Sequence, residues 1–153
     1  MTTDEAADKL RALLARMGIE ATVDAHDEPD HIALEVHGPE AGLVIGKHGA
    51  TLDALQYLVN KMAFVEESVR RPVYVDAEGY RRRRAEQLGE LAQRLAGKAK
   101  KSGRPVHAEP MLPADRRVMH LALADDPSVT TRSEGEGADR HLVIVPTDGA
   151  GGS

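Results

Sequence analysis

Two glycines three residues apart, Gly46 and Gly49, enclose Lys47 and His48 between an apolar run and a helical pattern. Glycine lets a backbone turn tightly and lets another backbone approach closely. The helix that the pattern predicts directly after the pair presents free N–H groups and a positive dipole end. Because Lys47 adds a cation, such a loop suits a sugar-phosphate backbone. The spacing alone would be typical of a plain tight turn, but its place before an amphipathic helix favours a binding loop.

The N-terminal half predicts the order helix, strand, strand, glycine-loop helix, strand. A capping box at Thr2 and Glu5 begins the first helix, and Gly18 ends it. Alternating and apolar patterns then predict three strands and one further helix. The strands are expected at residues 19–25, 32–36 and 72–76, and the helix from the glycine loop to about residue 65.

The C-terminal half predicts a long basic helix from Tyr80, a short strand, a second helix and a hairpin. The later elements are expected at residues 106–108, from 113 onward, and at 129–133 paired with 141–145. Val118, Leu121 and Ala122 are expected on the buried side of the second helix. The predicted fold class is therefore α+β, with small domains at residues 1–78 and 79–146 and a disordered tail at 147–153.

The formal net charge of −5 is unevenly distributed along the chain. Residues 1–40 contain ten acidic and three basic residues, whereas residues 70–104 contain eleven basic and four acidic ones. A basic block within an acidic chain creates a local positive potential that attracts a polyanion. The run Arg81 to Arg84 wraps around a helix, so we expect at least one of these arginines to pair with a carboxylate such as Glu78 or Glu86.

Composition excludes several classes of protein. With one Phe, three Tyr and no Trp, the chain has few aromatic side chains on which a sheet could stack bases. Without Cys there are no disulfides or thiolate metal sites. The seven histidines show no zinc-ligand spacing, so no metal or other cofactor is expected. No apolar run is long enough to insert into a membrane and no signal peptide is evident, which predicts a cytoplasmic protein.

A second set of candidate binding residues is Arg116 and His120, which lie four apart and share a helical face. Arg116 can hold a phosphate through two N–H groups or stack on a base, and lysine could not replace it in that planar role. His120 offers a flat ring and a hydrogen bond. On spacing alone the pair would be an ordinary solvated helix face.

Ile45-Gly46-Lys47-His48-Gly49 resembles the Ile-Gly-x-x-Gly loop of KH domains, and Arg116-x-x-x-His120 resembles the signature of R-three-H domains. Together with the join at residues 76–81, the chain resembles the Jag (SpoIIIJ-associated) family of bacterial RNA-binding proteins over residues 4–146. This resemblance implies a type II KH domain, with helices on one face of a three-stranded sheet, followed by a small R-three-H domain. Many family members carry an additional N-terminal module, whereas this sequence begins directly at the KH-like helix.

We therefore expect a non-enzymatic protein that binds single-stranded RNA, with single-stranded DNA as an alternative. The expected RNA-binding residues are Ile45, Gly46, Lys47, His48, Gly49, Arg81, Arg82, Arg84, Arg116 and His120, with the bases toward an apolar groove beside residues 32–36. The family resemblance also implies post-transcriptional regulation linked to the cell envelope or division, and a small KH-only partner protein. Two alternatives stay open. One is a protein-interaction scaffold that uses the acidic first 40 residues, and the other is a metal-dependent nuclease that uses the carboxylates at 125–126 and 134–136.

Overall fold

In the computed structural model, which describes residues 2–65 and 71–147, helix α1 (Thr3–Arg16) begins at the predicted capping box. The Thr2 hydroxyl accepts the N–H of Glu5, and the Glu5 carboxylate accepts the N–H of Thr2. Three strands then form one sheet in the order β1-β2-β3, where β1 and β2 are antiparallel and β2 and β3 are parallel. They are β1 (Thr22–Asp27), β2 (Ile32–His37) and β3 (Val73–Ala77).

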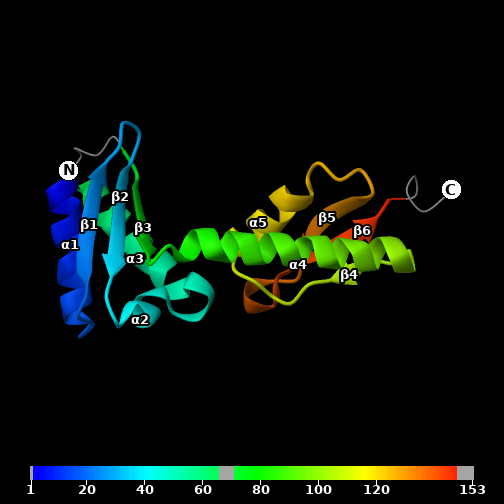
Figure 1. Ribbon diagram of the computed structural model, residues 1–153, viewed down its shortest axis with the longest axis horizontal. Helices are drawn as coiled ribbons and strands as arrows, with labels where there is room; N and C mark the ends of the chain where they lie inside the picture. The colour runs from blue at the N-terminus through cyan, green and yellow to red at the C-terminus, as the bar shows by residue number, and fades with distance from the viewer. Residues whose placement is uncertain (1, 66–70, 148–153) are drawn as a thin grey trace. The chain divides into compact units, whose positions relative to one another are not determined.

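Helices α1 and α3 (Ala50–Val65) cover one face of this sheet (Figure 1). Alternate strand residues face them because side chains along a strand point to opposite sides. Ile32, Leu34 and Val36 are buried in this core together with Leu10 of α1 and Leu52 of α3. The arrangement confirms the predicted helices on one face of a three-stranded sheet.

The outer edge of β3 is covered by side chains of α3. The Asn60 side chain donates to the Val73 carbonyl and accepts the Val73 N–H, at 2.8 and 2.9 Å. The Gln56 side chain accepts the Val75 N–H at 2.9 Å. Residues four apart on a helix lie on one face, so two amide side chains can satisfy an edge that would otherwise be open to another strand.

The second part of the chain contains a second three-stranded sheet, in the order β4-β6-β5 with both pairs antiparallel. Its core is formed by one side of each helix and by apolar residues of the sheet such as Leu142 and Ile144. Two small mixed domains confirm the predicted α+β class. The elements are α4 (Tyr80–Ser102), β4 (Val106–His107), α5 (Pro113–Leu123), β5 (Val129–Glu134), the short 3-10 helix η2 (Gly137–Asp139) and β6 (His141–Pro146).

Contacts divide the chain into two units, residues 1–81 and 82–153. Tyr80 and Arg81, which the sequence analysis assigns to the second domain, make the contacts described below with the first unit. Thr147, expected in the disordered tail, is hydrogen-bonded through its N–H to the Ser128 carbonyl at 2.9 Å. The rest of that predicted tail, residues 148–153, lies outside the described residues.

The predicted buried face of α5 is wrong in part. Leu121 is 57% exposed and Ala122 is also exposed, whereas Asp115, Met119 and Leu123 are buried. The buried stripe therefore follows a spacing of four that begins with an acidic residue, which hydrophobic periodicity cannot reveal. Within the described residues 2–65 and 71–147, no helix is both long and apolar enough to cross a membrane.

Candidate nucleic-acid interface

The glycine loop lies between two helices rather than after a plain apolar segment. A short helix, α2 (Ala41–Ile45), which the sequence analysis did not predict, leads into the loop. A single 3-10 turn, η1 (Lys47–Gly49), then joins it to α3. His48 adopts a left-handed conformation with φ 54° and ψ 28°, a region that His enters more readily than most non-glycine residues.

Both loop glycines are required by their backbone and by the space around them. Gly46 has φ 70° and ψ −165°, a region that is essentially restricted to glycine, and Gly49 has φ 85°. A Cβ atom on Gly46 would collide with the Thr51 side chain. A Cβ atom on Gly49 would lie 2.9 Å from the Tyr80 ring. The two glycines thus bring the loop backbone close to its own domain and leave its outer side open.

The outer side of the loop carries the predicted cation. Lys47 and His48 are exposed, and Ile45 is half-buried against the core. No carboxylate among residues 2–65 and 71–147 forms an ion pair with Lys47. Leu43, 60% exposed on α2, is an apolar side chain beside this loop that a base could contact.

The apolar side chains of β2 do not themselves line the groove that is expected beside residues 32–36. Ile32, Leu34 and Val36 are fully buried under α1 and α3, so these three side chains cannot meet a base. Their alternate neighbours point to the opposite face of the sheet, away from the two helices.

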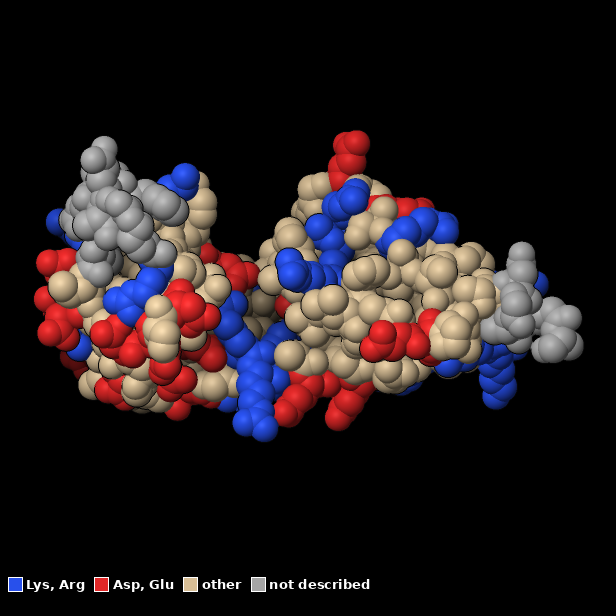
Figure 2. Space-filling model, turned by 90° about the horizontal axis from the view of Figure 1, so that it is seen from above, with Lys and Arg blue, Asp and Glu red and all other residues tan. Residues whose placement is uncertain are grey.

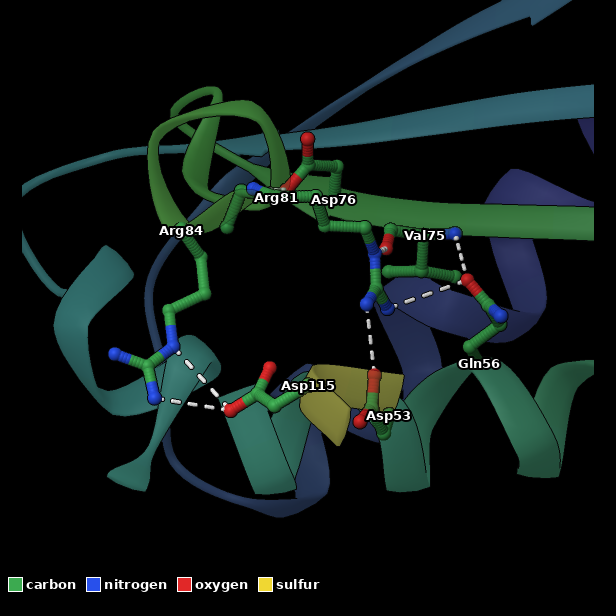
Figure 3. A network of polar contacts seen from close by, with 8 residues as sticks. Asp53, Gln56, Val75, Asp76, Arg81, Arg84 and Asp115 are labelled. Atoms are coloured by element: carbon green, nitrogen blue, oxygen red, sulfur yellow. Dashed lines mark hydrogen bonds and ion pairs between the residues drawn. The ribbon is translucent and has the colours of Figure 1, made fainter. Parts of the chain in front are cut away.

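Arg81, expected to contact RNA, is instead bound within its own domain (Figure 3). Its guanidinium donates to the Asp53 carboxylate at 2.7 Å, to the Val75 carbonyl at 2.9 Å and to the Gln56 side chain at 3.3 Å. Its backbone N–H also donates to Asp76, at 3.2 Å. Because the planar group has internal partners on all three of its nitrogens, we do not place Arg81 among the residues proposed to hold RNA.

Arg82 and Arg84 differ from each other in exposure and in their carboxylate partners. The Arg82 side chain is 88% exposed and pairs with Glu86 at 3.3 Å, which confirms the expectation that at least one arginine of the run pairs with a carboxylate such as Glu86. Arg84 instead donates to the Asp115 carboxylate at 3.0 Å, with both side chains largely buried (Figure 3). Arg84 therefore has a structural partner on α5, and only Arg82 of this group of three points to solvent.

The Arg84–Asp115 pair helps to determine which side of α5 faces outward. Asp115, Met119 and Leu123 are the buried residues of α5. Arg116 and His120 each directly follow one of them, so they share the face of the helix that lies beside β5, in agreement with the predicted shared face. The His120 Nδ1 atom is hydrogen-bonded to the Thr131 hydroxyl of β5, and Arg116 donates to the Met111 carbonyl at 2.7 Å.

A cleft of about 450 Å³ opens between α5 and β5. Thr131 and Ser133 of β5 pair with Ile144 and Leu142 of β6. Because alternate residues of a strand share a face, these two small polar side chains lie on the same side of the sheet and leave room beside the helix. The lining holds four arginines, one histidine and no carboxylate. It consists of Pro113, Arg116, Arg117, His120, Thr131, Arg132, Ser133, Arg140 and Leu142.

The charges around this cleft are only partly neutralised. Arg132 pairs with Glu134 at 2.7 Å, and this contact holds the pKa of the Glu134 carboxyl below its ordinary value. Arg140 donates to the Gly135 carbonyl at 2.8 Å. Within the described ranges, no carboxylate forms an ion pair with Arg116, Arg117 or Arg140. A dianionic or polyanionic ligand would find donors from both sides of the cleft.

Sequence reasoning found two of the cleft residues and missed the arginines that the fold adds to them. Arg117 occupies an unspecified position within the Arg-x-x-x-His spacing. Arg132 and Arg140 lie outside any motif, and the pairing of β5 with β6 brings these two to the cleft. The available signal was the alternation of Thr131 and Ser133 along a strand predicted to form a hairpin.

Comparisons with known proteins agree with this architecture. The profile of the KhpA/KhpB KH domain matches residues 4–75, and the profile of the R-three-H domain matches residues 86–146. The chain is 41% identical over 128 residues to the RNA-binding protein KhpB of Clostridium symbiosum, covering 84% of this chain and 58% of that protein. It is 33% identical over 137 residues to the RNA-binding protein KhpB of Bacillus subtilis, covering 88% and 66%.

A further relative, the RNA-binding protein KhpB of Lactiplantibacillus plantarum, is 34% identical over 138 residues, which cover 90% of this chain and 43% of that protein. The chain thus spans between 43% and 66% of the length of these three relatives. The two domain matches follow each other in the order that the glycine loop and the Arg-x-x-x-His spacing predict. The chain belongs to the Jag family of KhpB-type proteins, in which a KH domain precedes an R-three-H domain.

Proposed function

We propose that this protein is a cytoplasmic, non-enzymatic RNA-binding protein that holds single-stranded RNA at two separate surfaces. The observation that carries the proposal is the α5–β5 cleft, whose lining combines four arginines and His120 without a carboxylate. The glycine loop, with exposed Lys47 and His48, is the second surface. The names of the related KhpB proteins support RNA as the ligand.

Each surface contributes a different part of the binding. In the first unit the phosphates of a short strand approach the loop backbone and Lys47, while Leu43 contacts a base. In the second unit Arg116 and Arg117 hold phosphate, and the His120 ring stacks on a base or hydrogen-bonds to it. Each surface alone offers few contacts, and two such surfaces on one chain gain affinity through effective concentration.

A basic side of α4 adds an electrostatic attraction for RNA. Arg94, Lys98 and Lys101 are exposed and recur at spacings of four and three, which places them on one side of the helix. That side is opposite the buried residues Leu88 and Ala92. Figure 2 shows groups of Lys and Arg within a largely uncharged surface of the second unit, whereas many Asp and Glu side chains cover the first unit.

Two of the four carboxylates that a nuclease would need, Asp126 and Glu134, are engaged in ion pairs. Asp126 pairs with Lys100 at 2.7 Å and accepts the Ser128 N–H, and these contacts lower the pKa of its carboxyl. Glu134 pairs with Arg132. Among the described residues, no group of three or more His, Asp or Glu side chains is arranged to hold a metal ion. These contacts favour binding over metal-assisted cleavage.

The wider role implied by the family resemblance is part of the same proposal. It comprises post-transcriptional regulation linked to the cell envelope or division, together with a small KH-only partner protein. Tyr57 and Leu58, 61% and 44% exposed on α3, give the KH domain an apolar surface of the kind that protein partners cover.

The central test reverses charge on the glycine loop. A Lys47→Asp/His48→Asp variant should bind a fluorescein-labelled single-stranded RNA at least roughly tenfold more weakly, about 1.4 kcal/mol, because two negative charges would face phosphate. Fluorescence anisotropy measures the affinity, and circular dichroism verifies the fold. A Lys61→Asp/His26→Asp variant makes the same charge change at exposed positions of the same unit and should bind normally.

Salt and magnesium distinguish the alternatives. The logarithm of the binding constant should fall linearly with the logarithm of salt concentration, because bound Lys and Arg release counterions from the RNA. Unchanged affinity in the folded loop variant would remove the loop from the site. RNA cleavage on addition of magnesium would favour the nuclease, and capture of a protein partner that persists after RNase treatment would favour the scaffold.

A further inference from the structure

The join between β3 and α4, residues 76–81, contacts the elements around the glycine loop through Tyr80 and Arg81. Tyr80, the first residue of α4, packs against the core of the first unit. The edge of its ring lies directly against Gly49, since the Cε1 atom is 2.9 Å from the position that a Cβ atom on Gly49 would occupy. The phenol oxygen is farther away, at 3.6 Å from the same position.

The start of α4 is held in place by its neighbours, so the ring cannot easily withdraw. The Asp76 carboxylate accepts the Arg81 N–H at 3.2 Å and thereby satisfies one of the free N–H groups at the start of α4. The Arg81 guanidinium donates to the β3 backbone at Val75 and to Asp53 in the first turn of α3 (Figure 3). Arg81 thus connects α4 to the helix that directly follows the loop.

We propose that Tyr80 is a positioning residue for RNA binding, whose ring supports Gly49 from below and keeps the glycine loop in its binding conformation. The inference rests on the proposed function of the loop. His48 and both glycines have positive φ, a conformation that the loop retains only where its surroundings enforce it. A loop that is already ordered binds RNA without losing conformational freedom at that moment. Tyr80 itself does not contact the RNA.

The test combines stability and affinity in one double-mutant cycle on the full chain. Gly49→Ala should lower the urea midpoint of the first unit strongly in the parent protein and less in a Tyr80→Ala background, because the ring that its methyl group meets is then gone. The strain of a positive φ is the same in both backgrounds and cancels from the comparison. Additive effects of the two substitutions would show that the ring and Gly49 are not coupled, and would overturn the proposal.

Measurements of RNA affinity distinguish a positioning role of Tyr80 from an effect on stability alone. At a temperature where every variant is folded, Tyr80→Ala should bind a short single-stranded RNA at least fivefold more weakly, whereas Tyr80→Phe should bind normally because the ring edge is retained. Tyr74→Ala, which removes the same side chain from an exposed position on β3, should have no effect on affinity. Should Tyr80→Ala not fold, Tyr80→Leu replaces it, since leucine fills the core without placing a flat ring beneath Gly49.

The outcomes for Tyr80 and for the loop as a binding surface are distinguishable. Normal affinity in folded Tyr80→Ala or Tyr80→Leu, together with weak binding by Lys47→Asp/His48→Asp, would overturn the positioning role and leave the proposed function intact. Normal affinity in both sets of variants would overturn the function of the loop as well. Equal losses in Tyr80→Ala and Tyr80→Phe would assign the effect to the hydroxyl and likewise contradict support by the ring.

Discussion

Replacing Arg84 with Met should destabilise the second unit far more than the same change at Arg82. Arg84 lies 3.0 Å from the Asp115 carboxylate, and the two side chains are 19% and 9% exposed. Removing one member of a buried ion pair costs about 3–5 kcal/mol because the other charge stays buried without a partner. Arg84 keeps some exposure, so we expect the lower end, about 3 kcal/mol. Arg82 is exposed with its partner Glu86, and its loss should cost less than about 1 kcal/mol.

The two units must be observed separately in this measurement. The three tyrosines, Tyr57, Tyr74 and Tyr80, all lie within residues 1–81, so their fluorescence reports on the first unit. Hydrogen exchange of β5 and β6 peptides, read by mass spectrometry, reports on the second. A loss of about 3 kcal/mol corresponds to roughly 100-fold faster exchange of their most protected amides.

A compensating variant completes the cycle. Arg84→Met combined with Asp115→Leu removes both charges and should recover most of the protection, as expected when a buried pair is replaced by apolar side chains. The single Arg84 variant should also bind RNA more weakly while still folded, because Asp115 orients the helix that carries Arg116 and His120. If Arg84→Met speeds exchange no more than Arg82→Met, the pair does not hold α5 and this reasoning is wrong.

Arg116→Lys keeps the charge but loses the planar group, so RNA affinity should fall, and His120→Ala should add a further, non-additive loss because both side chains line one cleft. Lower thermal stability with normal RNA affinity in the folded variants would instead assign both residues a structural role. Arg132→Gln should raise the pKa of the Glu134 carboxyl toward its ordinary value of 4.5, which an NMR pH titration measures. Because Arg132 lowers that pKa in the folded protein, its contribution to stability is present above pH 4.5 and is lost as pH falls through the folded pKa. A stability difference between parent and variant that grows toward acid would contradict this assignment.

The local signals in the sequence were sufficient for the elements and for the first half of the site. The capping box at Thr2 and Glu5, the strand alternation and the basic helix from Tyr80 each depend on neighbours within a few residues, and the structure has all three. The glycine loop is local in the same sense. Its positive φ angles, and the exposure of Lys47 and His48, follow from four consecutive residues before a helix.

The role of each arginine could not be read from the sequence because it depends on partners distant along the chain. Arg81 and Arg84 are three residues apart and similar in sequence context, yet one is bound to Asp53 and the other to Asp115. A basic run shows charge but not which charges are already neutralised. Only the packing of α3 against β3, and of α5 against α4, determines that Arg82 alone of these three points to solvent.

The cleft likewise required tertiary structure. Sequence spacing placed Arg116 and His120 on one face of a helix, but hydrophobic periodicity assigned the buried side of that helix only in part, because the buried stripe begins with the charged Asp115. The pairing of β5 with β6 then brings Arg132 and Arg140 to the same cleft. The sequence by itself determined which residue types were available to bind a polyanion. The tertiary structure decided which of them meet, because long-range pairing and buried ion pairs leave no periodic trace in the chain.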